Sequence, residues 1–359
     1  MKNYLATRGK LEEAGGAELL SEIWDFVPTG EGWCFYANGL LEHYQRRVAI
    51  REAGRLIEQM HDLQSSVEET IREVIERTFA KLAIQGNREK MLKDYANEFL
   101  DILQKRSEQV DAVTGIDFGL PALDEIVGGL QGGEVCVIAA DTGVGKSALA
   151  LQAIRMASLD RGLPVALFSL EMSWVQLLER IHMQSGVPLQ ALRRGIFTKS
   201  ERAIVTETTQ LLIERNNIFI EDDFGLDIAG IYSRSRALKV KDDIKLIVVD
   251  YLQLVGASGV GRDANREREV AAVSHRLKAL AHELDLIVLS LSQLNDQGLL
   301  RESRAIGQDA DVVLVIKRPE SEGEPHEILV RKHRNGQAGV TIPVRFRGEQ
   351  MRFESNTNR

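Results

Sequence analysis

The spacing of apolar residues divides the chain into a helical first part and a second part in which short apolar runs alternate with helical segments. Up to about residue 86, apolar residues recur at helical spacing, first from Leu40 to Met60 and again from Val67 to Leu82. This spacing predicts two long amphipathic helices that pack against each other as antiparallel partners.

A third amphipathic helix is expected over residues 88–106, followed by a polar segment from Gln104 to Asp111. Its apolar face carries Leu92, Tyr95, Phe99, Ile102 and Leu103. An apolar stripe on a helix between two domains has to be buried against another surface. That surface is either the protein's own core or a neighbouring subunit, and the sequence leaves both open.

From residue 113 onward the pattern predicts an α/β domain. Apolar runs that predict strands lie at residues 135–139, 165–170, 217–221, 246–250, 286–290, 312–317, 327–331 and 342–346. Their alternation with helical segments predicts a parallel sheet covered by helices, with one or two antiparallel hairpins at the end. We therefore expect three parts: residues 1–86 as a helical N-terminal region, 87–112 as a linker helix and linker, and 113–359 as the α/β domain.

The first predicted strand leads into a phosphate-binding loop. An apolar, β-branched run is followed by small residues that end in Gly-Lys-Ser, and good helix formers follow from residue 148 to 154. The N–H groups of such a loop can surround phosphate oxygens, and the next helix points its positive end at them. The predicted nucleotide-binding residues are Ala140, Asp141, Thr142, Gly143, Val144, Gly145, Lys146 and Ser147.

Within this loop, Lys146 is expected to reach the β- and γ-phosphates of a nucleotide, and the Ser147 hydroxyl to ligate Mg²⁺. Ala140 stands where the first glycine of the motif is usual. Alanine forbids some positive-φ conformations but still lets a phosphate approach closely.

Polar residues follow three predicted strands at the ends where ligands bind on parallel sheets. Glu171, Asp250 and Gln293 each come after at least four mostly apolar residues. Asp250 fits a Walker B aspartate that holds Mg²⁺, and Glu171 is suited to orient and deprotonate an attacking water. Gln293 could hydrogen-bond the γ-phosphate or that water. The alternative for each is a polar residue that only marks the end of a strand.

Composition limits the other classes of function. The net charge of −8 gives no global attraction to nucleic acid, so any such binding must come from local basic segments. The two cysteines argue for a reducing compartment, and no zinc spacing is present. No apolar run reaches membrane-spanning length, so we expect a cytoplasmic protein with no membrane association.

A series of short motifs resembles the DnaB-type replicative DNA helicases with their RecA-like motor. They appear in family order over about residues 113–350. They are TGI at 114–116, GGLQ at 128–131, the loop ending at Ser147, FSLEM at 168–172, VDYLQL at 249–254, LKALA at 277–281, SQLN at 292–295, LRES at 300–303, QDAD at 308–311 and KHRNG at 332–336.

This resemblance implies a RecA-like P-loop ATPase domain that uses ATP and Mg²⁺. Lys146 and Ser147 would bind phosphate and magnesium, Glu171 would be the catalytic carboxylate, Asp250 the Walker B acid and Gln293 the sensor.

The resemblance also implies that Lys332 and Arg334 project from a hairpin into the active site of the next subunit, as a sensor lysine and an arginine finger. A guanidinium stabilises charge that develops on the γ-phosphate, and its supply by a neighbour couples hydrolysis to ring geometry. The alternative for both residues is a solvated basic hairpin.

DNA contacts are implied for two segments. Residues 300–304 resemble the stretch that holds strand phosphates, which makes Arg301, Glu302 and Arg304 candidates, although the family usually has Gly at position 304. The loop at 256–268, with Arg262 and Arg266, resembles a channel loop, and a solvated loop is its alternative. Phosphate contacts of this kind are independent of sequence and sensitive to salt.

Two further departures qualify the resemblance. Residues 11–16 resemble a point midway through the family's N-terminal domain, so that domain, which forms the N-terminal collar and supports the primase contact, is expected to be partial. The polar insertion that usually follows Asn295 is short, as expected of a compact, divergent or phage-borne relative.

The favoured function is a ring, expected to be hexameric, that uses ATP to move 5′ to 3′ on single-stranded DNA and unwinds the duplex at the replication fork. A helicase loader and a primase are candidate partners. The alternatives are another RecA-type DNA-dependent ATPase, such as a recombination accessory, and a nucleotide-gated assembly protein.

Overall fold

The structure is a computed structural model that describes residues 33–61, 66–83, 92–108, 114–250, 266–294, 304–319, 321 and 324–356. It divides into two compact units with a boundary between Lys105 and Arg106, and each unit is described by itself. Among the described residues, every helix is too short or too polar to span a membrane.

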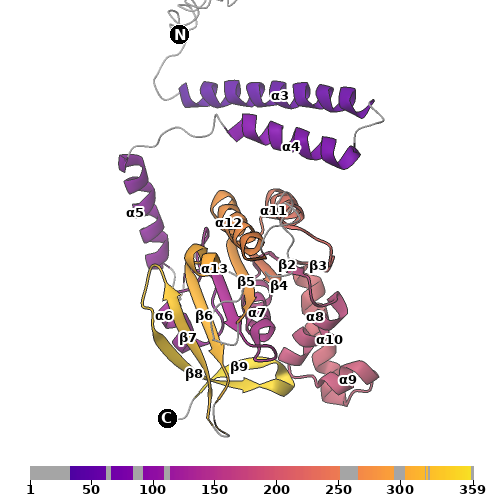
Figure 1. Ribbon diagram of the computed structural model, residues 1–359, viewed down its shortest axis with the longest axis vertical. Helices are drawn as coiled ribbons and strands as arrows, with labels where there is room; N and C mark the ends of the chain where they lie inside the picture. The colour runs from indigo at the N-terminus through magenta and orange to yellow at the C-terminus, as the bar shows by residue number, and fades with distance from the viewer. Residues whose placement is uncertain are drawn as a thin grey trace, which may run out of the picture. The chain divides into compact units, whose positions relative to one another are not determined.

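The described residues of the first unit are almost all helical, as predicted. Helices α3 (Trp33–Met60) and α4 (Val67–Ala83) lie side by side (Figure 1), and each buries a valine, Val48 in α3 and Val74 in α4. Helix α5 is longer than expected at its end and spans Leu92–Glu108. The polar segment predicted from Gln104 is therefore helical as far as Glu108, because glutamine, lysine and arginine are good helix formers on an exposed face.

The second unit contains one nine-stranded sheet in the order β3-β2-β4-β5-β1-β6-β7-β8-β9. The first six strands in this order run parallel and the last three run antiparallel, which confirms the predicted mainly parallel sheet with hairpins at its end. The strands are β1 (Val135–Ala140), β2 (Val165–Ser169), β3 (Ile218–Glu221), β4 (Leu246–Asp250), β5 (Ile287–Gln293), β6 (Val312–Lys317), β7 (His326–His333), β8 (Val340–Arg347) and β9 (Arg352–Ser355).

Strand β9 was not predicted from the sequence. It is short, and Phe353 is its one fully buried side chain, so it carries no apolar run. It becomes a strand by pairing with β8, where Phe353 lies opposite Phe346.

Helices cover both faces of the sheet (Figure 1). They are α6 (Pro121–Val127), α7 (Lys146–Arg155) with a π-helical continuation η1 (Met156–Asp160), α8 (Trp174–Gln184), α9 (Leu189–Arg194), α10 (Lys199–Arg215), α11 (Ile228–Asp242), α12 (Arg266–Leu284), α13 (Arg304–Asp309) and the 3₁₀ turn η3 (Gly348–Gln350).

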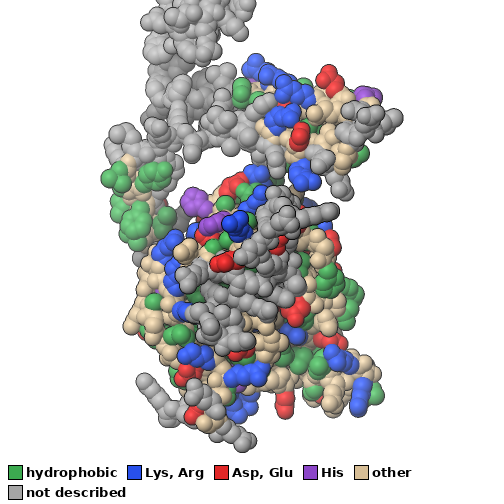
Figure 2. All heavy atoms as spheres, viewed as in Figure 1, with side chains coloured by type: hydrophobic (Ala, Val, Ile, Leu, Met, Phe, Trp, Pro, Cys, Tyr) green, Lys and Arg blue, Asp and Glu red, His purple; other side chains and the backbone are tan. Residues whose placement is uncertain are grey.

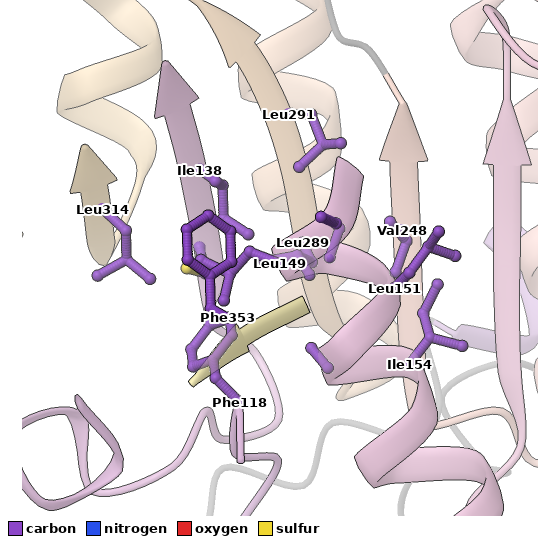
Figure 3. Packing of buried hydrophobic residues seen from close by; sticks show 14 of the residues in the cluster. Phe118, Ile138, Leu149, Leu151, Ile154, Val248, Leu289, Leu291, Leu314 and Phe353 are labelled. Atoms are coloured by element: carbon purple, nitrogen blue, oxygen red, sulfur yellow. The ribbon is translucent and has the colours of Figure 1, made fainter. Parts of the chain in front are cut away.

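Two apolar clusters, one on each face, form the core. Alternate residues of β1 belong to different clusters, with Ile138 in the first and Val137 in the second. In the first cluster, Leu149 of α7 packs near Leu289 of β5 (Figure 3). Helices α11 and α12 supply the second cluster. Because the central strands are buried on both faces, β1 and β6 are nearly continuous apolar runs, while β5 also buries Ser290 and Ser292.

Candidate nucleotide-binding site

The loop between β1 and α7 has the backbone of a phosphate-binding loop. Gly143 and Gly145 have φ values of 74° and 113°, which other residues rarely adopt. A Cβ on Gly145 would lie 2.8 Å from Cζ of Phe353. The first turn of α7 has no side-chain cap, so its N–H groups are available to an anion.

Ser147 and Asp250 meet beside this loop. The Ser147 hydroxyl donates to Oδ2 of Asp250 at 2.9 Å. The other carboxylate oxygen, Oδ1, is buried and has no hydrogen-bond partner within the described ranges. Hydroxyl and carboxylate oxygens are the ligands that Mg²⁺ prefers. This pair of side chains therefore fits a magnesium site.

Burial raises the pKa of Asp250 to about 6, because desolvation disfavours the carboxylate. The Ser147 hydrogen bond opposes this rise, the negative charge of Glu171 adds to it, and Arg180 and Lys146 oppose it. A cation bound beside Asp250 would therefore stabilise its ionised form.

Lys146 lies within reach of the same charges. Its ammonium donates to the Ala140 carbonyl at 3.4 Å. Burial lowers the pKa of Lys146, and the carboxylates of Asp250, Glu171 and Asp141 oppose that shift. Glu171 itself is exposed at the turn after β2. The structure thus brings Lys146, Asp250 and Glu171 to one place.

Gln293 also reaches the phosphate-binding loop. At the end of β5, its side-chain amide donates to the Thr142 hydroxyl at 2.7 Å. Because β5 pairs in parallel with β1, Gln293 lies opposite Ala140. Four of the sequence-predicted residues, Lys146, Ser147, Asp250 and Gln293, therefore stand on or beside one loop.

Two arginines at this site were missed by the sequence analysis. Arg318, just after β6, donates to the Thr142 carbonyl at 2.8 Å. It follows a strand at the ligand-binding edge, so the rule that found Gln293 could have found it. Arg180 of α8 interacts electrostatically with Asp250 and Glu171, and its pKa is lowered by burial. We see no signal in the sequence that marks Arg180.

Lys332 and Arg334 lie at the opposite end of the sheet from this loop. Arg334 follows β7 and binds Asp311, which precedes β6 and accepts a hydrogen bond from the Val135 N–H at the start of β1. A six-residue strand is about 20 Å long at roughly 3.3 Å per residue. Arg334 is thus separated from the phosphate-binding loop of its own chain by the length of β1.

The Lys332 ammonium is engaged within its own chain. It donates to three carbonyl oxygens at the end of α13, those of Gly307 at 2.8 Å, Gln308 at 2.9 Å and Ala310 at 2.5 Å. Burial lowers the pKa of Lys332, and the positive charge of Arg334 lowers it further. In this structure Lys332 therefore caps a helix.

The predicted DNA-binding residues lie outside what the structure describes. Arg262, Arg301 and Glu302 fall outside the described ranges, and the side chains of Arg266 and Arg304, at the starts of α12 and α13, are not described either.

Comparisons with known proteins identify the family of this chain. Residues 115–355 match the model of the DnaB-like helicase C-terminal domain. The chain is 32% identical over 374 residues to the replicative DNA helicase DnaB of Leifsonia xyli subsp. xyli, a match that covers 97% of this chain and 80% of that protein.

Solved structures give the same result. A DnaB-like replicative helicase, described with its interactions with primase, matches 99% of this chain and 87% of its own, with a TM-score of 0.71 and 26% identity. A separately solved ATPase domain matches 72% of this chain and 98% of its own, with a TM-score of 0.65 and 29% identity. The chain belongs to the DnaB-like helicase family.

Proposed function

We propose that the protein is a replicative DNA helicase driven by ATP, with its ATP sites between neighbouring copies of the chain in a ring. One observation carries the proposal. The phosphate-binding loop lies at the carboxyl end of the parallel strands, while Arg334 lies at their amino end. Each chain thus offers two half-sites that face different neighbours.

At the first half-site the residues suit hydrolysis of ATP. Lys146 holds the β- and γ-phosphates, and Ser147 and Asp250 hold Mg²⁺, which would neutralise phosphate charge when bound. Glu171 orients the attacking water and accepts its proton. Gln293, bonded to Thr142, contacts the γ-phosphate or that water and senses whether the γ-phosphate is present.

At the second half-site, Arg334 is the arginine finger for the next subunit. Its side chain is 52% exposed, so much of the guanidinium is available to a ligand outside its own chain. An arginine finger stabilises negative charge on the transferred phosphoryl group. Lys332 is the companion sensor, and it would exchange its three carbonyl contacts for phosphate oxygens.

Helix α5 supports assembly into a ring. Apolar side chains gather along it (Figure 2), and two of them, Leu92 and Leu100, are 84% and 63% exposed. An apolar stripe of this kind marks a protein–protein contact. We propose that α5 packs on a neighbouring copy and holds the subunits together, with six subunits in the ring.

Single-stranded DNA is the proposed polymer substrate, held by residues 300–304 and by the loop at 256–268, with movement 5′ to 3′. A primase is the proposed protein partner, because the solved relative that is described with primase matches nearly the whole chain. A helicase loader is the second proposed partner.

Strand displacement on a forked duplex with a 5′ tail tests the proposal. The wild-type protein should displace the strand in the presence of ATP and Mg²⁺, and DNA should stimulate its ATPase activity. Lys146→Ala should abolish both activities. Lys241→Ala, which removes an exposed lysine of α11, is the matched control and should change neither.

Two outcomes would contradict the proposal. A protein that hydrolyses ATP but never displaces a strand, with or without a loader, is no helicase. A protein whose ATPase ignores DNA, and whose function survives Glu171→Gln, fits a nucleotide-gated assembly protein instead.

A further inference from the structure

A buried carboxylate holds the arginine at the amino end of the sheet. Asp311 lies between α13 and β6, and only 5% of its side chain is exposed. Its Oδ1 pairs with Nη1 of Arg334 at 3.1 Å, and its backbone carbonyl accepts the Arg334 N–H at 2.8 Å. Arg334 is therefore fixed by Asp311 through both its backbone and its side chain.

The second oxygen of Asp311 ties this pair to the rest of the fold. Oδ2 accepts the Val135 N–H at 2.8 Å and the Lys278 ammonium at 2.6 Å. Val135 begins the central strand β1, and Lys278 belongs to α12 and also donates to the Gly133 carbonyl at 2.9 Å. Asp311 is thus anchored to the buried central strand β1 and to helix α12.

The charges of Asp311, Lys278 and Arg334 leave the Arg334 guanidinium able to bind an anion outside its own chain. Two cations, Lys278 and Arg334, share one carboxylate, so the group keeps a net positive charge. Arg334 uses one terminal nitrogen on Asp311, and a guanidinium has five N–H donors. The remaining donors can therefore bind a phosphate while the first contact persists.

We propose that Asp311 is the positioning residue for Arg334, which it holds in the orientation that completes a neighbour's ATP site. This inference rests on the proposed function, in which Arg334 acts in trans. A long, exposed arginine samples many rotamers, and a fixed partner limits that search before the nucleotide arrives. Asp311 itself touches no substrate.

The substitution Asp311→Asn isolates this contact. The asparagine oxygen can keep the contacts with Val135 and Lys278, and its amide nitrogen then faces the Arg334 guanidinium, so two donors oppose each other. We expect kcat of the DNA-stimulated ATPase to fall by about 10- to 100-fold, as for a misplaced catalytic group. The KM for ATP should change little.

Mixed rings show whether the loss acts in trans. Asp311→Asn chains keep their own phosphate-binding loop, and Lys146→Ala chains keep an intact Arg334. When the two variants are co-expressed with different tags and purified as mixed rings, ATPase activity should return. Such a return also requires the Asp311→Asn chain to be folded, so it separates a loss of position from a loss of structure.

Two comparisons complete the experiment. Arg334→Ala should be restored by Lys146→Ala in the same way. Asp309→Asn is the matched control, because Asp309 lies two residues earlier and binds Ser274 and His275 instead of Arg334. It should keep near wild-type activity on its own.

Each result has one meaning. Wild-type activity of Asp311→Asn, or a failure of mixed rings to restore it while Arg334→Ala is restored, overturns the positioning role. If Arg334→Ala is not restored either, the action of Arg334 in trans is wrong and the positioning role falls with it. Should Asp311→Asn fail to assemble, Asp311→Glu, which keeps the charge but moves it by one methylene, is used with the same criteria.

Discussion

Two buried aspartates, one at each end of the parallel sheet, have opposite surroundings. At the carboxyl end, the carboxylate of Asp250 accepts a hydrogen bond from Ser147 at one oxygen, and its other oxygen is buried with no partner among the described residues. At the amino end, Asp311 accepts hydrogen bonds from Val135 and Lys278 and pairs with Arg334.

This difference separates a ligand site from a scaffold. Burying a polar oxygen without a partner is costly, and a cation bound to Oδ1 of Asp250 would offset that cost. A buried carboxylate met by three donors needs nothing further and can fix its partners in place. The comparison supports the two proposals, in which Asp250 binds Mg²⁺ and Asp311 positions Arg334.

The largest effect at the carboxyl end of the sheet is expected from Glu171→Gln. We expect kcat for ATP hydrolysis to fall by at least about 100-fold, because the amide cannot accept the proton of the attacking water. Affinity for nucleotide should be retained, since Glu171 is not expected to bind phosphate. Steady-state ATPase rates and binding titrations measure both quantities.

A matched acid provides the control for that prediction. Glu221 also ends a parallel strand, β3, but pairs with Arg234. Glu221→Gln should leave hydrolysis close to wild type. An equal loss in both variants would mean that acids at this edge serve the fold instead of the reaction.

A smaller effect is expected from Gly145→Ala in the phosphate-binding loop. The substitution places a Cβ at φ 113° and 2.8 Å from Phe353, so we expect the free energy of unfolding to fall by about 2 kcal/mol. Denaturant unfolding measures this change.

Gly128→Ala separates the effect of the positive φ from the effect of the close contact with Phe353. Gly128 also has a positive φ, 72°, but has open space around its Cβ position. It should cost only about 1 kcal/mol and leave nucleotide binding intact. If Gly145→Ala and Gly128→Ala lower the free energy of unfolding equally, then Phe353 moves to accommodate the new methyl group and the close contact adds no cost.

The smallest effect concerns the pH dependence of Asp250. Its pKa is raised from 3.8 to about 6 in the folded protein, so the folded state holds this proton to higher pH than the unfolded chain does. The group therefore favours folding below about pH 4, and this contribution is lost as the pH rises through 6.

Binding of Mg²⁺ with nucleotide should have the opposite sign, because it needs the ionised carboxylate. At pH 6 about half of the Asp250 side chains would be protonated before the ligand binds, so affinity should fall about twofold from its value at pH 8. Calorimetry at several pH values measures this fall. Asp250→Asn should also remove the loss of folding stability that is expected between about pH 4 and pH 6. If the dependence of stability on pH is the same in this variant, another group causes it.

The sequence was most informative where a function is encoded in one continuous segment. The phosphate-binding loop, its strand and its helix are local, and the central strands are mostly apolar because both faces are buried. The position of Gln293 followed from the rule for parallel strands, and the structure places it on Thr142.

Contacts between distant segments could not be predicted in this way. Arg180 reaches the site from α8, and nothing in the sequence states which loop it faces. Strand β9 exists because β8 is beside it, and α5 continues through polar residues that the pattern assigned to a linker.

The sequence by itself determined which side chains gather at the phosphate-binding loop, since they lie close together in the chain or at strand ends that a parallel sheet must align. Only the tertiary structure decided how the two buried aspartates differ. Whether a carboxylate is satisfied depends on donors brought from other elements, Val135, Lys278 and Arg334 for Asp311 and Ser147 for Asp250. Those donors are separated along the chain and meet only when the sheet and its helices are packed.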